Sequence, residues 1–232
     1  MTPSDVSIET GRRVRFPVVW GIGRNYADHA AELGNALPER PLVFMKNPAA
    51  VIDPGAPLVL PPIADEPVSQ TDYEGELAVV IGRDCRDVAE ADALACVAGY
   101  AAANDVSARW WQKEGSGGQF VRGKSFDGFC PVGEVAPARA VADPQDLRIE
   151  TRLNGETVQS ASTASMIFTV AQLIAELSRG TTLLAGSLVL TGTPSGVGAG
   201  RTPPRFLVPG DRVEVEITGL PVLRHEVQAA GG

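Results

Sequence analysis

Residues 71–82, Thr-Asp-Tyr-Glu-Gly-Glu-Leu-Ala-Val-Val-Ile-Gly, join an acidic first half to an apolar second half. The apolar run over 77–81 predicts a strand buried in the core, and Gly82 ends it. Because residues two apart on a strand share one face, acids at alternate positions are expected to project together. Buried like charges repel one another, so we expect a cation to compensate them. The acids at these alternate positions are Asp72, Glu74 and Glu76.

The composition is that of a globular protein built around one large domain. Apolar residues make up 44% and charged residues 21% of 232 residues, enough chain to bury a substantial core. The net charge of −8 argues against nucleic acid as a partner, because phosphates bind basic surfaces. Three widely separated cysteines fit a reducing compartment. Without a signal-peptide pattern or an apolar stretch of roughly 20 residues, the sequence predicts a cytoplasmic protein that does not bind membranes.

Short strands outnumber helices along the chain and do not alternate regularly with them, which predicts an α+β fold with a β-rich core. Asn154-Gly155 predicts a type I′ hairpin between strands at 147–153 and 156–160. Asn25 is expected to cap a short helix that stops at Gly34. Residues 112–124 are interpreted as a mobile loop. Longer helices are predicted over 88–100 and 169–179.

A third carboxylate, Asp105, follows another apolar run and could join Glu74 and Glu76. An all-oxygen ligand set selects Mg²⁺, Mn²⁺ or Ca²⁺ over zinc. The alternative is that the Glu-x-Glu pair lies on the wet face of an edge strand, and the residues alone leave both interpretations open.

Two further positions could carry chemistry. Glu32 lies three residues after His29 and therefore on the same helix face, where a carboxylate would orient the imidazole as a general base. Lys124, between a glycine and aromatic residues, could polarise a carbonyl or enolate oxygen. The alternative for each is an ordinary solvated side chain, and for the turn at 191–198 an ordinary polar turn.

Taken together, these segments resemble the fumarylacetoacetate hydrolase family, especially its short members that act on acylpyruvates or oxaloacetate. Five blocks in the family's order carry the resemblance and extend over most of the chain from 20 to 217. They are Gly-Arg-Asn-Tyr-Ala-Asp-His at 23–29, Asp-Tyr-Glu-Gly-Glu-Leu at the start of 72–82, Asn-Asp-Val-Ser-Ala-Arg at 104–109, Gly-Lys-Ser-Phe-Asp at 123–127 and Thr-Gly-Thr-Pro at 191–194.

The resemblance implies a mixed β-sandwich roll over residues 20–232, preceded by an extension at 1–19 that packs on it, and a homodimer. It implies Mg²⁺ or Mn²⁺, with Ca²⁺ as a further candidate, and leaves Asp72 outside the ligand set. The longer relatives' N-terminal domain and additional acid near the metal are not matched. The implied metal ligands are Glu74, Glu76 and Asp105. The implied catalytic residues are His29 and Glu32 on a lid helix, with Lys124. The implied substrate contacts are Arg24, Arg109, Gln112, Gly192 and Thr193.

These residues predict a metal-dependent hydrolase that cleaves a carbon–carbon bond in 2,4-dioxo acids such as acylpyruvates or fumarylpyruvate. His29 would activate water, and the metal with Lys124 would stabilise the pyruvate enolate that leaves. The same residues would serve an oxaloacetate decarboxylase, or an isomerase or hydratase of unsaturated 2-keto acids from aromatic degradation. A non-catalytic protein that binds metal or dicarboxylates is the alternative from another class.

Overall fold

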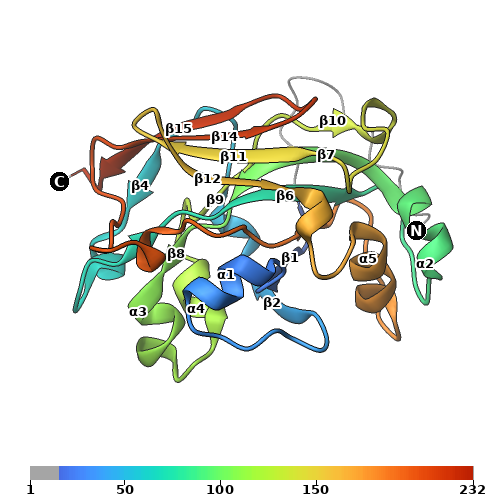
Figure 1. The fold of residues 1–232 in the computed structure, drawn as a ribbon, viewed down its shortest axis with the longest axis horizontal. Coiled ribbons are helices and arrows are strands. Elements are labelled where there is room, and N and C mark those ends of the chain that lie inside the picture. Colours follow the sequence, from blue (N-terminus) through green and yellow to red (C-terminus); the bar gives the residue numbers. More distant parts are fainter. Residues whose placement is uncertain (1–15, 232) are drawn as a thin grey trace.

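A computed structural model describes residues 16–231, which form a β-rich α+β fold with a few short helices, as the sequence predicts (Figure 1). Within this part of the chain the longer strands are β1 (Val19–Gly23), β2 (Leu42–Lys46), β4 (Leu58–Leu60), β6 (Gly75–Ile81), β7 (Val97–Asn104), β11 (Arg148–Leu153), β12 (Glu156–Ser162), β13 (Leu188–Leu190), β14 (Arg212–Ile217) and β15 (Leu223–Ala229). The two-residue strands are β3 (Val51–Ile52), β5 (Thr71–Asp72), β8 (Ser107–Ala108), β9 (Cys130–Pro131) and β10 (Ala136–Pro137). The helices are α1 (Ala27–Glu32), α2 (Glu90–Ala93), α3 (Arg109–Gln112), α4 (Phe120–Lys124) and α5 (Val170–Ser178).

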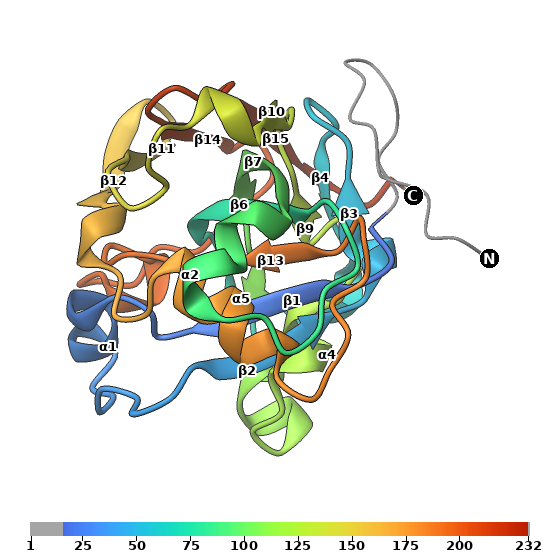
Figure 2. The same ribbon diagram turned by 90° about the vertical axis from the view of Figure 1, so that its right-hand side faces the viewer.

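Most strands belong to two sheets that pack against each other. One sheet has the order β10-β7-β6-β13-β1-β2 and the other β12-β11-β14-β15-β4. The pairs β3–β9 and β5–β8 form small separate ladders. Contacts of β6 and β7 with β11 and β14 join the two layers. Helices α1, α3 and α4 lie on the far side of the first sheet from the second, and α2 packs on α5 at one end (Figures 1 and 2).

Strand β6 is buried on both faces, which explains its unbroken apolar run. Leu77, Val79 and Ile81 belong to the core between the sheets. Ala78 and Val80 belong to a second core cluster on the opposite face. Because the acids before them continue this alternation, Glu74 and Glu76 lie on the face turned away from the second sheet.

The helix predicted over 88–100 is wrong. Only Glu90–Ala93 is α-helical, followed by a 3₁₀ turn, and β7 begins at Val97. This strand pairs antiparallel with β6 along nearly its whole length, from Asn104 opposite Gly75 to Val97 opposite Ile81. Its alanines fit between two packed layers, so tertiary pairing overrides the helix propensity of alanine.

Two local predictions are confirmed. Asn154 and Gly155 both have positive φ, 54° and 84°, as a type I′ turn requires, and they join β11 to β12. Helix α5 begins after Thr169, whose side chain accepts from the Gln172 amide in a capping box.

Two other local predictions need correction. Asn25 does not cap α1; its side-chain amide donates to the carbonyls of Phe168 and Thr191 instead. Residues 112–124 are not a plain loop, because they contain the end of α3, a 3₁₀ turn and α4. The predicted extension at 1–19 lies largely outside the described residues.

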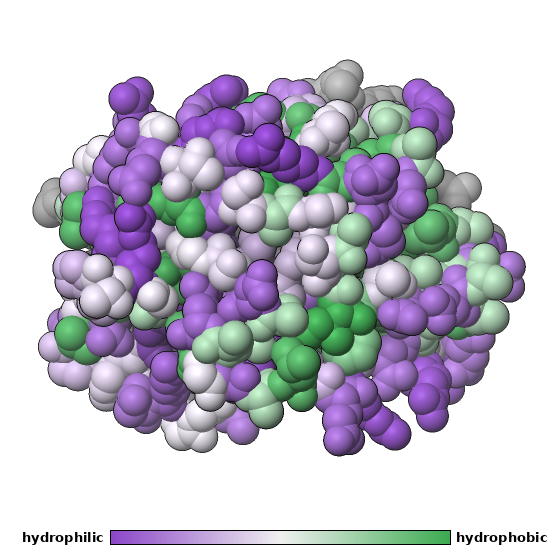
Figure 3. All heavy atoms as spheres, viewed as in Figure 1, coloured by the Kyte–Doolittle hydropathy of each residue, from purple (hydrophilic) through white to green (hydrophobic). Residues whose placement is uncertain are grey.

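Hydrophilic residues cover much of the face shown in Figure 3, with smaller apolar areas between them. Among residues 16–231, no helix is both long and apolar enough to cross a bilayer.

Candidate functional site

Three carboxylates meet where β6 and β7 lie side by side. Glu74 directly precedes β6, Glu76 is its second residue, and Asp105 directly follows β7. The Asp105 amide donates to the Glu74 carbonyl oxygen at 2.8 Å, which aligns the two chain segments. One oxygen from each carboxylate lies within 4.8 Å of the others, and each residue is at most 4% exposed. The structure therefore brings together the three acids that the sequence grouped.

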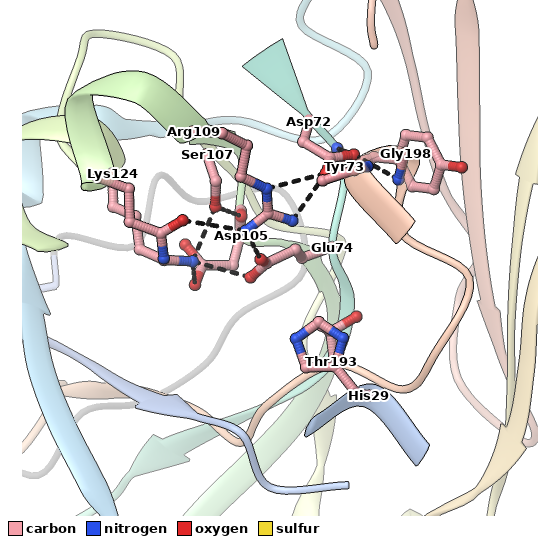
Figure 4. A network of polar contacts seen from close by, with 12 residues as sticks. His29, Asp72, Tyr73, Glu74, Asp105, Ser107, Arg109, Lys124, Thr193 and Gly198 are labelled. Carbon is pink, nitrogen blue, oxygen red and sulfur yellow. Dashed lines mark hydrogen bonds and ion pairs between the residues drawn. The ribbon is translucent and has the colours of Figure 1, made fainter. Parts of the chain in front are cut away.

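Buried cations surround this cluster (Figure 4). Lys124 Nζ, at the end of α4, lies 2.8 Å from Glu74 Oε2 and 2.5 Å from Asp105 Oδ2. Arg109 Nη1, at the start of α3, lies 2.6 Å from Glu74 Oε1. Lys46 Nζ, at the end of β2, contacts Asp105 Oδ1. These ammonium and guanidinium groups offset part of the negative charge in the cluster.

The cations divide unequally between the two glutamates. Burial alone would raise the pKa of Glu74, but the charges of Lys124 and Arg109 hold that pKa well below its usual range. Burial raises the pKa of Glu76, and the charges of Asp105 and Glu74 raise it further against the weaker effect of Lys124. The ionised form of Glu76 is thus under-compensated compared with that of Glu74.

A hard divalent cation fits this arrangement. The converging donors are all carboxylate oxygens, the ligand type that Mg²⁺, Mn²⁺ and Ca²⁺ prefer. The under-compensated charge of Glu76 is what a cation held by Glu74, Glu76 and Asp105 would neutralise. The buried acidic triad could therefore bind a divalent metal.

The predicted catalytic pair is His29 with Glu32, and His29 lines one pocket together with Glu74 and Glu76. His29 Nδ1 lies 2.8 Å from Glu32 Oε1, and the imidazole is almost fully buried although α1 is a surface helix. An ionised Glu32 only accepts, so Nδ1 carries a proton, and in the neutral imidazole Nε2 is then the nitrogen with a lone pair. The pocket has a volume of about 130 Å³. Its lining includes Arg24, His29, Glu74, Glu76, Arg109, Gln112, Lys124 and Thr193.

Three of the predicted substrate-contacting residues form hydrogen bonds with other groups of the protein. Gly192 donates its amide to Glu76 Oε2 at 2.7 Å, and Thr193 Oγ1 donates to the Gly75 carbonyl at 2.9 Å. Gln112 Oε1 accepts from Arg109 at 3.1 Å. Gly192 therefore orients a carboxylate of the cluster, while Thr193 and Gln112 also line the pocket.

Sequence reasoning missed Lys46 and the contacts of Asp72. The period-two pattern of β2 held a signal for Lys46, because it places that side chain on the buried face with Phe44. Asp72 is completely buried, and Arg109 donates to its Oδ2 from Nε at 2.9 Å. Asp72 also accepts three backbone amides, those of Tyr73, Gly198 and Ala199.

The family model for the fumarylacetoacetate (FAA) hydrolase C-terminal region matches residues 18–228. The chain therefore belongs to the fumarylacetoacetate hydrolase family, in agreement with its sequence motifs.

Among its relatives is "Oxaloacetate tautomerase YisK" of Bacillus subtilis (strain 168), which is 45% identical over 209 residues, 89% of this chain and 68% of that protein. The crystal structure of fumarylpyruvate hydrolase from Pseudomonas aeruginosa in complex with Mn²⁺ and pyruvate aligns with a TM-score of 0.84 at 32% identity, covering 99% of this chain and 97% of that one. The 5-carboxymethyl-2-hydroxymuconate delta-isomerase from Mycobacterium smegmatis aligns with a TM-score of 0.81 at 38% identity, covering 94% and 81%. The chain spans about two thirds of the length of the curated relatives it matches, 64% to 68% of each.

Proposed function

We propose that this chain is a divalent-metal-dependent enzyme that interconverts the enol and keto forms of oxaloacetate, a small 2-oxo dicarboxylic acid. The observation that carries this proposal is the composition of one pocket. It is lined by Glu74 and Glu76 of the carboxylate cluster, by Lys124, and by His29 with its ring nitrogen oriented by Glu32. These are the groups that moving a proton next to a carbonyl requires.

Glu74, Glu76 and Asp105 would hold the cation, for which we propose Mg²⁺ or Mn²⁺. When bound, it would act as a Lewis acid toward the 2-oxo group and make the neighbouring carbon more acidic. The Mn²⁺ in the related fumarylpyruvate hydrolase structure supports this choice of metal.

His29 would transfer the proton. In the direction from keto to enol, its Nε2 would take a proton from C3, and the electron pair of that C–H bond would form the C2–C3 double bond. Negative charge would then develop on the 2-oxo oxygen, and the proton held by His29 would pass to that oxygen, which gives the enol and returns the imidazole to its neutral form. Lys124 would stabilise that oxygen by donating a hydrogen bond from its ammonium group. Glu32 would keep the imidazole in the tautomer that leaves Nε2 unprotonated.

Two observations support a small, doubly negative substrate. The cationic residues Arg24, Arg109, Lys113 and Lys124 line the pocket and suit carboxylates. Its volume of about 130 Å³ is close to the ~150 Å³ cavity that accommodates benzene. The relative at 45% identity, named as an oxaloacetate tautomerase, supports the same substrate class.

Cleavage of a carbon–carbon bond in acylpyruvates is the second candidate. The related fumarylpyruvate hydrolase matches this chain over nearly the full length of both, whereas the tautomerase relative is longer. In that reaction His29 would deprotonate a water molecule that attacks the 4-carbonyl, and the pyruvate enolate would leave.

A substrate comparison tests the proposal. Metal-loaded protein is mixed with enolic oxaloacetate and, separately, with an acylpyruvate; loss of enol absorbance and formation of pyruvate are both measured. We expect faster conversion of enolic to ketonic oxaloacetate than in buffer, without pyruvate formation. His29→Ala should lower this rate about 10²- to 10⁴-fold, which is the usual contribution of a general acid or base. Pyruvate from the acylpyruvate alone would favour the second candidate, pyruvate from oxaloacetate would indicate decarboxylation, and no turnover of either compound would contradict both proposals.

A further inference from the structure

We infer that the loop at 196–200 positions Glu32 against His29, and that Asp72 holds this loop in place. The kinetic part of this inference rests on the function proposed above. The structural part is the hydrogen-bonded contact between Gly196 of the loop and Glu32, here called the clasp, and it follows from the geometry alone.

The two carboxylate oxygens of Glu32 have different partners. Oε1 faces His29 Nδ1 at 2.8 Å, and Oε2 accepts from the Gly196 amide at 2.9 Å. Glu32 is the last residue of α1, which is only six residues long. A helix this short has little stability of its own. The contact with Gly196 therefore ties the end of the helix to the loop, and it fixes the carboxylate that orients the imidazole.

The loop has glycines where a side chain would strike Glu32 or the neighbouring strand β12. A Cβ added at Gly200 would lie 2.5 Å from Glu32 Oε2 and 3.2 Å from its Cγ. Gly196 has a φ of 103°, and a Cβ there would lie 1.9 Å from the Val158 carbonyl oxygen. Gly200 thus leaves the space that the Glu32 side chain fills, and Gly196 adopts the backbone conformation that aims its amide at Oε2.

Asp72 and Tyr73 hold the loop at 196–200 in place through hydrogen bonds. Asp72 accepts the amides of Gly198 at 2.7 Å and Ala199 at 2.9 Å, and Tyr73 donates its hydroxyl to the Gly196 carbonyl at 3.0 Å. Asp72 is completely buried, and Arg109 offsets its charge. The two hydrogen bonds to the Asp72 carboxylate are charge-assisted, and the one from Gly198 is fully buried, which favours a fixed geometry.

Asp72 is therefore a positioning residue that acts through the loop on Glu32. The same short segment, from Asp72 to Glu76, supplies two carboxylates of the triad and fixes the partner of His29. Small displacements of a supporting group can cost much of an enzyme's rate, so a rigid link between the two halves of the site has a catalytic use.

Gly200→Ala tests this link. Its φ is not in the left-handed region, and the atom that its Cβ would strike is the end of a flexible side chain, so we expect the fold to persist while the Glu32 carboxylate moves. The predicted result is a kcat about 10- to 100-fold lower, the usual effect of losing an orienting partner. KM for oxaloacetate and the affinity for Mn²⁺ should stay at wild-type values. An unchanged kcat would overturn the inference.

A double-mutant cycle separates positioning from general damage. If Gly200→Ala acts only by displacing Glu32, it should cause no further loss in a Glu32→Ala background, where there is no carboxylate to displace. A loss in kcat that multiplies with the loss from Glu32→Ala would mean that Gly200→Ala acts elsewhere, and the inference would be wrong.

Amide hydrogen exchange at Gly196 provides a test that needs no turnover. We expect a protected amide in the wild type and similarly faster exchange in Glu32→Ala and Gly200→Ala. If the wild type converts neither substrate, the proposed function fails while this measurement still decides on the clasp. Equal exchange rates in all three proteins would overturn the clasp whatever the activity.

Discussion

Glu74 and Glu76 are the same residue type two positions apart, but the fold gives them different surroundings. Glu74 lies between the charges of Lys124 and Arg109, while Glu76 accepts a neutral backbone amide from Gly192. The ionised form is therefore stabilised at Glu74 and disfavoured at Glu76, as the opposite directions of their pKa shifts indicate. The under-compensated residue is the one that a bound cation would relieve most.

The two glutamine variants should consequently behave in opposite ways when no metal is bound. Glu74→Gln leaves two buried cations short of a partner, and we expect it to lower the free energy of unfolding by about 3 kcal/mol. Glu76→Gln removes a repelling charge and keeps an acceptor for Gly192, so the stability should stay the same or rise. Urea unfolding of chelator-treated proteins measures both. A large destabilisation by Glu76→Gln would contradict the charge distribution described here.

The carboxylate triad could be predicted at this scale, because the alternation at 72–76 and an acid after a second apolar run both appear in the sequence. Lys46 could not be assigned in the same way. The period-two pattern of β2 places Lys46 on the buried face, but the sequence does not identify Asp105 as its partner, because that contact depends on how the fold places β2 relative to the end of β7. Asp72 shows the same limit, since its partners at 198 and 199 lie far away along the chain.

At the scale of elements, prediction succeeded where local chemistry determines the conformation. The Asn154-Gly155 turn and the start of α5 depend on residues within a few positions of one another. Strand β7 could not be predicted from local sequence, because its alanines favour a helix and only pairing with β6 makes the segment a strand. The short helices at 109–124 also depend on tertiary contacts, including an edge-to-face contact between Trp111 and Phe126 with ring centroids 6.0 Å apart.

The capping box of α5 gives a prediction at this scale. Thr169→Ala removes the side-chain acceptor for the Gln172 amide, and it should lower the free energy of unfolding by about 1 kcal/mol without changing turnover. Thr181→Ala is the matched control, because Thr181 is exposed just beyond the end of the helix, and it should change stability by less than about 0.5 kcal/mol. Chemical denaturation of both variants checks the difference. Equal effects would mean that the cap does not stabilise α5.

Across the whole molecule, the two sheets are joined by a polar contact as well as by the core. His225 of β15 lies 3.1 Å from the Asn104 amide nitrogen at the end of β7. The side-chain oxygen of Asn104 accepts from the Glu74 amide, so its nitrogen is the donor and His225 Nε2 accepts. Burial lowers the pKa of His225 from 6.5 to about 4. The fold therefore selects the neutral imidazole.

This lowered pKa predicts how stability depends on pH. Above the unfolded-state pKa of 6.5 the imidazole is neutral in both states, and its contribution is complete. As the pH falls from there toward about 4, the unfolded chain gains a proton that the folded protein does not, so stability decreases. Between about pH 7 and about pH 4.5, the loss due to His225 should be roughly 2 to 3 kcal/mol.

His225→Gln keeps an acceptor for Asn104 and does not titrate, so it isolates this effect from the carboxylates. Its free energy of unfolding should fall less than that of the wild type over the same acid range. Parallel curves for the two proteins would show that His225 titrates alike in the folded and unfolded states.

We propose that the buried triad binds a divalent cation on which turnover depends. The most direct measurement follows the conversion of enolic oxaloacetate by chelator-treated protein while Mn²⁺ is added back, with Glu76→Gln in parallel. We expect the wild-type rate to rise from the buffer level to a plateau, while the rate of Glu76→Gln stays near the buffer level at the same Mn²⁺ concentrations. Full activity of the chelator-treated wild type, or an equal response of Glu76→Gln to Mn²⁺, would contradict it.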